Sequence, residues 1–287
     1  MSQPALKQLS TGEILDVSFG LYRQLFGPLL MVQIVCSSLP FLLNVYATAA
    51  GENSASSVLV LLNYMLSFVL GALATAATCH LISERYLGRT ISASDALRRA
   101  GPRIGPLMVL SLMVGLVTVI SAVPFLVVVG VSIAGLATAG FNGGFPLVVF
   151  GLGLLLLALP IAVFSGVSVG TQCLVYEPQL DAGRAMSRSW FLTKGFKGRI
   201  VALLLTFALL FAVPIGGVLT LLRLGLGAGD ATGAEPWQEV IIVVATSLVA
   251  FVVTPLLYCM LTLVYYDLRV RKEGFDLELR ERGLEAA

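Results

Sequence analysis

Long uncharged stretches alternate with short polar segments along almost the whole chain. Apolar stretches of about 20 residues or more, long enough to cross a bilayer as helices, occupy residues 27–50, 57–83, 200–222 and 240–266. A further stretch, from Ile104 to Tyr176, is too long for a single crossing. The segment "AGFNGGFP", Ala139–Pro146, interrupts it with the turn formers Asn-Gly-Gly and Pro. The pattern therefore predicts six transmembrane helices.

The composition supports a membrane environment. Hydrophobic residues make up 57% of the chain and charged residues only 12%, whereas a soluble domain has roughly a quarter of its residues charged. The first residues include Glu13 and Asp16 and contain no compact apolar core of a signal peptide. We therefore predict one polytopic domain, residues 1–287, in the plasma (inner) membrane.

Lysine and arginine occur in alternate loops. The basic segments lie before the first span and after the second, fourth and sixth spans, with the residues Lys7, Arg23, Arg85, Arg89, Arg98, Arg99, Arg103, Arg184, Arg188, Lys194, Lys197, Arg199, Arg269, Arg271, Lys272, Arg280 and Arg282. The opposite loops, 51–56, 140–145 and 226–238, contain neither residue type. Cytoplasmic loops are enriched in these bases, so both termini are expected in the cytoplasm. Arg223, near the outer end of the fifth span, is the exception and is expected to extend toward the interface.

A unit of two spans is used three times. Each odd-numbered span contains a proline (Pro40, Pro124 and Pro214), and each return span ends at an acid (Glu84, Glu177 and Asp267). The units cover about 10–84, 92–177 and 181–267, followed by a tail at 268–287. Since every unit crosses twice, the units are parallel repeats.

A short helix precedes each hairpin. In the first, Ser10 and Glu13 have capping-box spacing, followed by apolar residues at helical intervals. The second begins near Ser92 or Ser94, and the third at Asp181. The third places Trp190 opposite Arg184. Such amphipathic helices lie in the headgroup plane; the alternative is a solvated cytoplasmic helix. The predicted fold is an all-α integral membrane protein of six transmembrane helices, arranged as three repeated hairpins, each preceded by a short amphipathic cytoplasmic helix.

The basic segments provide the first candidate site. Juxtamembrane bases are attracted to anionic lipids, and tryptophan favours the interface. The predicted anionic-lipid-binding residues form one basic collar: Arg98, Arg99, Arg103, Arg184, Arg188, Trp190, Lys194, Lys197 and Arg199. The alternative is that these arginines pair with Glu84, Glu177, Asp181 and Asp267. Of these acids, we expect Glu84, Glu177 and Asp267 to tether the short helices to the bundle.

Polar residues within the spans provide the second candidate site. Possible cavity-lining residues are Gln33, Asn44, His80, Ser165, Thr171 and Gln172. His80 lies one turn before Glu84, so the pair could relay protons or form a solvated hydrogen bond. The prolines could act as hinges or serve packing alone. Small residues, including Gly166 and Gly170, are expected to pack the return spans together near the bundle centre.

Signatures of enzymes are absent from the sequence. Four cysteines match no metal or redox spacing, and a single histidine excludes a histidine-rich metal site. Neither an H-E-x-x-H motif, a nucleophile elbow nor a Walker motif occurs. We therefore expect no catalytic residues, no metal, no cofactor and no nucleic-acid partner.

Three segments resemble a known family. They are "ILDVSFGLYRQLFGPLL" near the start, "AMSRSWFLTKGFKGRIV" in the middle and "LTLVYYDLRVRKEGFDLEL" near the end. The pattern is similar to the bacterial membrane domain that precedes some glycerophosphodiester phosphodiesterase domains, and to its stand-alone relatives. The resemblance implies a helical bundle and a lipid-related role. The chain ends soon after Asp267, so we expect the stand-alone form without a catalytic domain.

Two functions remain open from the sequence. The first is a non-enzymatic membrane protein that interacts with anionic lipids or is accessory to a partner membrane protein. The alternative is a transporter or flippase for a lipid or small amphiphile, since the chain has repeated hairpins and a proline in each odd-numbered span. A polar cavity at mid-depth would favour transport, and a solid apolar core would favour the first function. Oligomeric state is left open.

The topology can be tested by single-cysteine labelling in a background without the native cysteines. We expect cysteines at Ser54, Asn142 and Thr232 to react only from outside, and those at Ser92, Ser187 and Ala286 only from the cytoplasm. An impermeant maleimide applied to intact cells and to inverted vesicles distinguishes the two groups. Labelling of the first group from the cytoplasmic side would contradict the six-span topology.

Overall fold

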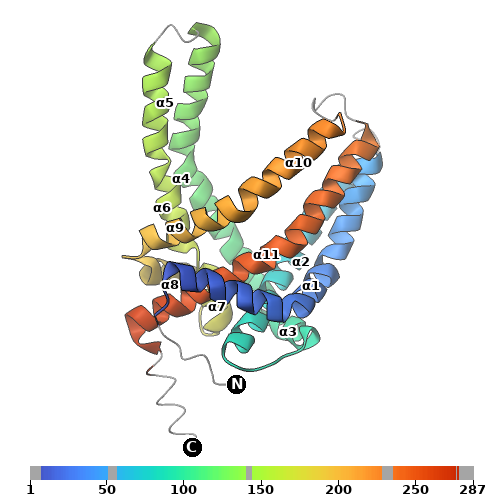
Figure 1. Ribbon diagram of the computed structural model, residues 1–287, viewed down its shortest axis with the longest axis vertical. Coiled ribbons are helices and arrows are strands. Elements are labelled where there is room, and N and C mark those ends of the chain that lie inside the picture. The colour runs from blue at the N-terminus through green and yellow to red at the C-terminus, as the bar shows by residue number, and fades with distance from the viewer. Residues whose placement is uncertain (1–7, 51–56, 140–143, 228–234, 276, 278–287) are drawn as a thin grey trace, which may run out of the picture.

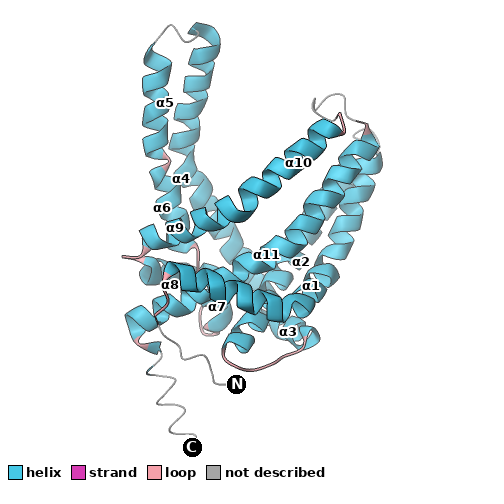
Figure 2. Ribbon diagram, viewed as in Figure 1, coloured by secondary structure: helices cyan, strands magenta, loops and turns pink. Residues whose placement is uncertain are grey.

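The chain is almost entirely helical. The computed structural model describes residues 8–50, 57–139, 144–227, 235–275 and 277, and Figure 2 shows helices and connecting loops with no strand among them. The elements are α1 (Thr11–Ala50), α2 (Ser57–Tyr86), α3 (Ala93–Ala100), η1 (Gly101–Arg103), α4 (Ile104–Ala139), α5 (Gly144–Leu156), α6 (Ala158–Val167), α7 (Gly170–Tyr176), α8 (Ala182–Thr193), α9 (Lys197–Phe207), η3 (Ala208–Ala212), α10 (Val213–Gly225) and α11 (Pro236–Glu273).

Six helical stretches are long and apolar enough to cross a membrane. They are Thr11–Ala50, Ser57–Tyr86, Ala93–Gly135, Val148–Tyr176, Lys197–Gly225 and Pro236–Glu273. The predicted all-helical fold with six helices long and apolar enough to span a membrane is therefore confirmed.

The spans diverge from a common helical base. We define the base as α3, η1, α7 and α8 together with the adjoining ends of α1, α2 and α11. Figure 1 shows two arms leaving it, one formed by α4 and α5 and the other by α1, α2, α10 and α11. The first described turn of α1 and the last turn of α11 both lie in the base, where the Leu9 amide donates to Asp267 Oδ1 (2.8 Å).

The buried core lies in the base, not along the arms. Small side chains such as Ala77 and Cys79 of α2, Cys173 of α7 and Cys259 of α11 are fully buried, and their size lets helix backbones approach closely. In the arms, large apolar side chains are exposed, for example Leu155 (73%). Exposed apolar side chains are stable in lipid, so the arms match a hydrocarbon environment whereas the base is held by internal packing.

The first predicted short helix is continuous with its span. α1 runs from Thr11 to Ala50, through Pro28 and Pro40. Figure 1 shows its dark-blue first part crossing the base and its lighter part rising in the right-hand arm. A proline removes one backbone hydrogen bond and bends a helix. The expected capping box is confirmed, since Ser10 N donates to Glu13 Oε2 (2.7 Å) and Glu13 N donates to Ser10 Oγ (3.3 Å).

The other two short helices begin where the sequence predicts. Ser92 caps α3 by accepting from the Asp95 amide (3.1 Å), and Asp181 caps α8 by accepting from the Arg184 amide (2.7 Å). On α3, Ala96 is buried and Arg98 is exposed. These caps satisfy amides that have no partner within their own helix.

The fourth span is broken, and α8 stabilises the break. The backbone leaves the α-helix at Leu157 and at Ser168–Val169, which separates α5, α6 and α7. The carbonyl of Gly166 accepts from Ser189 Oγ (2.9 Å) and Thr193 Oγ1 (3.1 Å) of α8. A free carbonyl inside a membrane span needs such a partner, so α8 holds the span in its broken form.

The three return spans meet at the base through hydroxyl groups. Tyr176 Oη donates to the Cys79 carbonyl (3.0 Å) and lies 2.9 Å from Thr262 Oγ1, so one side chain joins α7 to α2 and α11. Ser83 Oγ lies 2.6 Å from Tyr266 Oη. Gly166 and Gly170 were predicted to pack the return spans against one another, but they contact other helices. Gly166 faces Trp190 of α8, and Gly170 faces Leu110 of α4 and Ser189 of α8.

We expect Gly166→Ala to destabilise the protein. An added Cβ would lie 2.3 Å from the Trp190 ring, so α8 must shift, and such overpacking costs about 1–3 kcal/mol. Gly71→Ala is the matched control, because nothing lies within 4 Å of its Cβ position. Melting in detergent should show a lower midpoint for Gly166→Ala only. Equal midpoints for the two variants would contradict the packing of α8 on α6.

Candidate functional site

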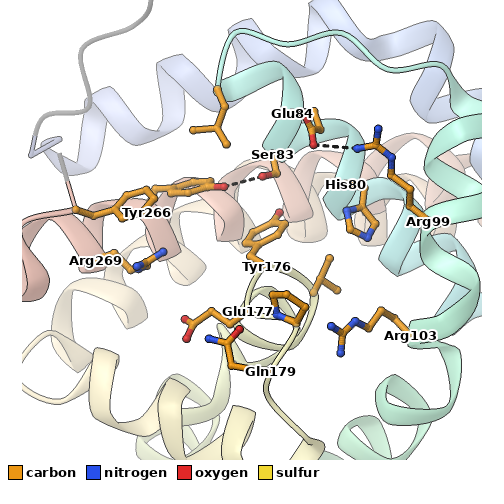
Figure 3. Close-up of a pocket in the computed structure, with 14 residues that line it drawn as sticks. His80, Ser83, Glu84, Arg99, Arg103, Tyr176, Glu177, Gln179, Tyr266 and Arg269 are labelled. Carbon is orange, nitrogen blue, oxygen red and sulfur yellow. Dashed lines mark hydrogen bonds and ion pairs between the residues drawn. The ribbon is translucent and has the colours of Figure 1, made fainter. Parts of the chain in front are cut away.

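A polar pocket of about 580 Å³ opens in the base where the hairpins meet. Its wall is formed by the last turns of α2, by α3 and η1, by the end of α7 with the following loop, and by α11. Figure 3 shows side chains from these elements converging on it, including His80, Arg103 and Arg269. Pro178 and Gln179 are exposed on its rim.

The α2 wall carries a histidine and an acid one turn apart. Glu84 Oε1 accepts from Arg99 Nη1 of α3 (3.1 Å), and Arg89 lies at 3.8 Å from the other carboxylate oxygen. His80 Nε2 is a buried atom without a hydrogen-bond partner among the described residues. The predicted His80–Glu84 hydrogen bond is therefore not formed at this nitrogen, and Glu84 links α2 to α3 instead.

The α7 wall carries the second acid. Both carboxylate oxygens of Glu177 accept from Arg188 Nε of α8 (3.2 Å each), and Oε1 also accepts from Tyr265 Oη (2.9 Å). Arg188 Nη2 donates to Glu273 Oε2 of α11 (2.8 Å). Burial opposes the Arg188 charge, but the hydrogen bonds to Glu273 and the nearby Glu177 outweigh it, so the pKa of Arg188 is raised. This arginine remains charged and joins α7, α8 and α11.

The third acid, Asp267, lies outside the pocket at a buried junction. Its side chain is 2% exposed. One oxygen accepts from the Leu9 amide (2.8 Å), and the other accepts from Arg199 (2.8 Å) and Arg271 (2.9 Å). Arg199 and Arg271 also donate to the Leu9 carbonyl. This network joins the segment before α1, the start of α9 and the end of α11.

Aromatic side chains form a part of the site that was not predicted from the sequence. Tyr176 stacks on Tyr266 with ring centroids 5.7 Å apart, and Tyr266 stacks on Phe275 at 6.0 Å. Tyr176, Tyr266 and Phe275 line the pocket, as does Arg269, which lies over the Phe275 ring at 3.9 Å. A signal was present, because "VYEP" and "YYDL" place tyrosine directly before the acid that ends a return span.

The predicted lipid-binding bases divide into paired and unpaired groups. Arg99, Arg188 and Arg199 lie in the ion pairs described above. Arg184 lies 3.7 Å from Asp181, with both side chains exposed. No described residue lies within ion-pair distance of Arg98, Arg103, Lys194 or Lys197. Figure 1 places α3 and α8 on opposite sides of the base, so the two basic segments are separate surfaces.

The predicted cavity-lining residues are mostly scattered. His80 alone of the six lines the 580 Å³ pocket. Gln33, Ser165 and Gln172 are buried, Asn44 is exposed, and Thr171 is half-buried. Neither carboxamide atom of Gln172 has a hydrogen-bond partner among the described residues. A second recess of about 260 Å³, between α1, the end of α2 and the segment that follows α2, contains none of the six.

The cysteines and acids provide no evident metal site. All four cysteines are buried and unpaired. Within the described ranges, no three His, Cys, Asp or Glu side chains come close enough together to hold a metal ion.

Comparisons with known proteins give no family assignment. The chain matches no protein-family model, no curated protein and no solved structure. The resemblance to the membrane domain of glycerophosphodiester phosphodiesterases therefore stays a sequence-based expectation.

We expect Asp267→Asn to lower the free energy of unfolding by about 2–4 kcal/mol, because two arginines lose their buried acid. Glu239→Gln is the control: Glu239 pairs with the half-exposed Arg223 at the other end of the molecule, and an exposed pair contributes about 0–1 kcal/mol. Denaturant titration in mixed micelles measures both variants. Similar losses for both would contradict a structural role of the Asp267 junction.

Proposed function

We propose that this chain is a non-enzymatic plasma-membrane protein whose base lies at the cytoplasmic leaflet and binds anionic lipids. One observation carries the proposal. Trp190 and Phe191 at the end of α8 are 41% and 54% exposed, and lysines surround them. We call Trp190, Phe191, Lys194, Lys197 and Lys272 the Trp190 patch.

The geometry of the Trp190 patch is typical of an interfacial anchor. Lys197 Nζ lies 3.6 Å from the centroid of the Trp190 ring, and Lys272 Nζ lies 4.9 Å from that of Phe191. Exposed Lys194 lies one turn beyond Trp190. Tryptophan rings favour the headgroup level, and each juxtamembrane lysine gains about 1 kcal/mol near an anionic leaflet. In contrast, Arg188 and Arg199 are already neutralised by acids, so they act mainly as structural links.

The proposed topology follows from the positions of the bases. The first described turn of α1 and the last of α11 lie at the same end as α3 and α8 (Figure 1), where most of the lysines and arginines are found. The positive-inside preference favours this end as cytoplasmic. In this proposal the chain consists of three hairpins, each introduced by an amphipathic helix. The contacts Glu84–Arg99 and Glu177–Arg188 support it, because each ties a return span to a short helix.

The alternative function, a transporter or flippase, has less support. Transport of a lipid or amphiphile would favour a polar cavity at mid-depth. Neither pocket described above contains Gln33, Asn44, Ser165 or Thr171.

An accessory role toward a partner membrane protein is compatible with the exposed arms, which leave long apolar faces uncovered within the chain.

The test is retention of phosphatidylglycerol by the double variant Lys194→Gln/Lys272→Gln. Loss of two bases near the leaflet should weaken phosphatidylglycerol binding roughly tenfold or more, at about 1 kcal/mol each. Native mass spectrometry of protein from phosphatidylglycerol/phosphatidylcholine nanodiscs measures bound lipid. Arg23→Gln/Arg89→Gln removes the same charge from exposed positions of the base outside the patch and should retain wild-type binding.

Two outcomes would contradict this proposal. Equal loss in both double variants would show that general charge, not the Trp190 patch, attracts the lipid. Rapid lipid scrambling by the wild-type protein in reconstituted vesicles would favour the transport function instead.

A further inference from the structure

The pocket in the base contains positive and hydrogen-bonding groups that the fold does not use. Arg103, on η1, is half-buried in the pocket wall, and no described residue lies within ion-pair distance of it. His80 Nε2, on α2, is buried and has no hydrogen-bond partner among the described residues. A buried polar atom without a hydrogen bond lowers stability by about 1–3 kcal/mol. A ligand that forms a hydrogen bond to this atom would remove that cost and therefore bind more tightly.

The two acids that line the pocket do not neutralise Arg103 or pair with His80. Glu84 is held by Arg99, and Glu177 is held by Arg188 and Tyr265. Arg99, Arg103 and Arg269 line the pocket against these two acids. Arg188 holds Glu177, and Glu273 of α11 pairs with both Arg188 and Arg269. Three carboxylates thus face four guanidinium groups, and Arg103 is the one of the four without an acid among the described residues. The excess charge at the pocket is therefore positive.

We infer that this pocket binds a phosphate-bearing anion, with Arg103 and Arg99 from one wall and Arg269 from the other directed at the phosphate, and His80 Nε2 as a further partner. In Figure 3, Arg103 and Arg269 extend into the pocket from opposite sides, and His80 lies above Arg103. Guanidinium groups form paired hydrogen bonds to phosphate oxygens, and a tetrahedral anion accepts donors from several directions at once.

The size of the pocket also fits such a ligand. A volume of about 580 Å³ exceeds what a single carboxylate needs and lies within the usual range for small-molecule sites. The stacked rings of Tyr176, Tyr266 and Phe275 offer an apolar wall for the group that carries the phosphate. Two sources have this chemistry: the headgroup of an anionic lipid and a soluble phosphate ester.

Ligand binding would join the hairpins, because the wall comes from α2, α3, η1, α7 and α11. A ligand that binds only the folded state raises the melting midpoint, and the stabilisation grows with the logarithm of one plus the ratio of ligand concentration to Kd. The inference goes beyond the proposed lipid contact of the Trp190 patch, because none of the patch residues lines the pocket. The lipid contact of the Trp190 patch and the phosphate site in the pocket can therefore each be disproved while the other stands.

The experiment measures melting of the detergent-solubilised full chain at constant ionic strength against four probes. They are dihexanoyl phosphatidylglycerol, dihexanoylglycerol, glycerol 3-phosphate and inorganic phosphate. We expect the midpoint to rise with the concentration of at least one phosphate-bearing probe, and not to rise with dihexanoylglycerol. A rise confined to the phosphatidylglycerol identifies a lipid headgroup, and an equal rise with glycerol 3-phosphate identifies a soluble ester.

Three variants locate the site. Arg103→Gln should raise the Kd of the active probe at least about tenfold, the effect of losing a charge-assisted pair. Arg98→Gln removes an equal charge from an exposed position of α3 outside the pocket and should leave the Kd within about twofold. His80→Leu should weaken binding without lowering the midpoint of the unliganded protein, since it removes a buried atom that has no hydrogen-bond partner in the described part of the chain.

The inference is overturned if no phosphate-bearing probe raises the wild-type midpoint, or if Arg98→Gln weakens binding as much as Arg103→Gln. If Arg103→Gln fails to fold, His80→Leu tests the proposed phosphate site, because an unchanged Kd in that variant would contradict the site. Lys194→Gln/Lys272→Gln is expected to bind the probe normally, which separates this result from that of the Trp190 patch.

Discussion

Close packing of α2, α7 and α11 in the base is the constraint on which the rest of the structure depends. The arms expose large apolar side chains and share few contacts with each other, so they do not orient one another. Tyr176 reaches both the Cys79 carbonyl and Thr262, and small side chains at Ala77, Cys79 and Cys173 permit the approach. Lipid offers no hydrophobic gain for helix association, so close packing and hydrogen bonds hold the spans together.

The same packing determines which charges are structural and which are free. Once the ends of the return spans meet, Glu84, Glu177 and Asp267 come within reach of arginines from neighbouring elements. Those arginines satisfy the acids and become links between helices. Among the described residues, the bases without an acid within ion-pair distance include Arg103 in the pocket wall and the lysines of the Trp190 patch, and these groups can attract an external anion.

Much of this organisation can be predicted from local sequence. Six spans follow from charge-free length, and the starts of α3 and α8 follow from Ser92 and Asp181 as capping residues. The continuous α1 was harder to predict, because a proline such as Pro28 can end a helix or only bend it. The contacts of Gly166 were predicted incorrectly, since small residues indicate close approach but not the identity of the neighbour, which is Trp190 of α8.

By itself, the sequence determined the lipid environment, the number of spans and the polar ends where charges gather, because these depend on the solvation of each residue and its near neighbours. Only the tertiary structure decided which charges meet. Leu9 and Asp267 are 258 positions apart, and Arg188 and Glu273 are 85 apart, so no local pattern could pair them. The pocket was likewise hidden, because its walls come from five elements, α2, α3, η1, α7 and α11, whose approach depends on side-chain packing in the base.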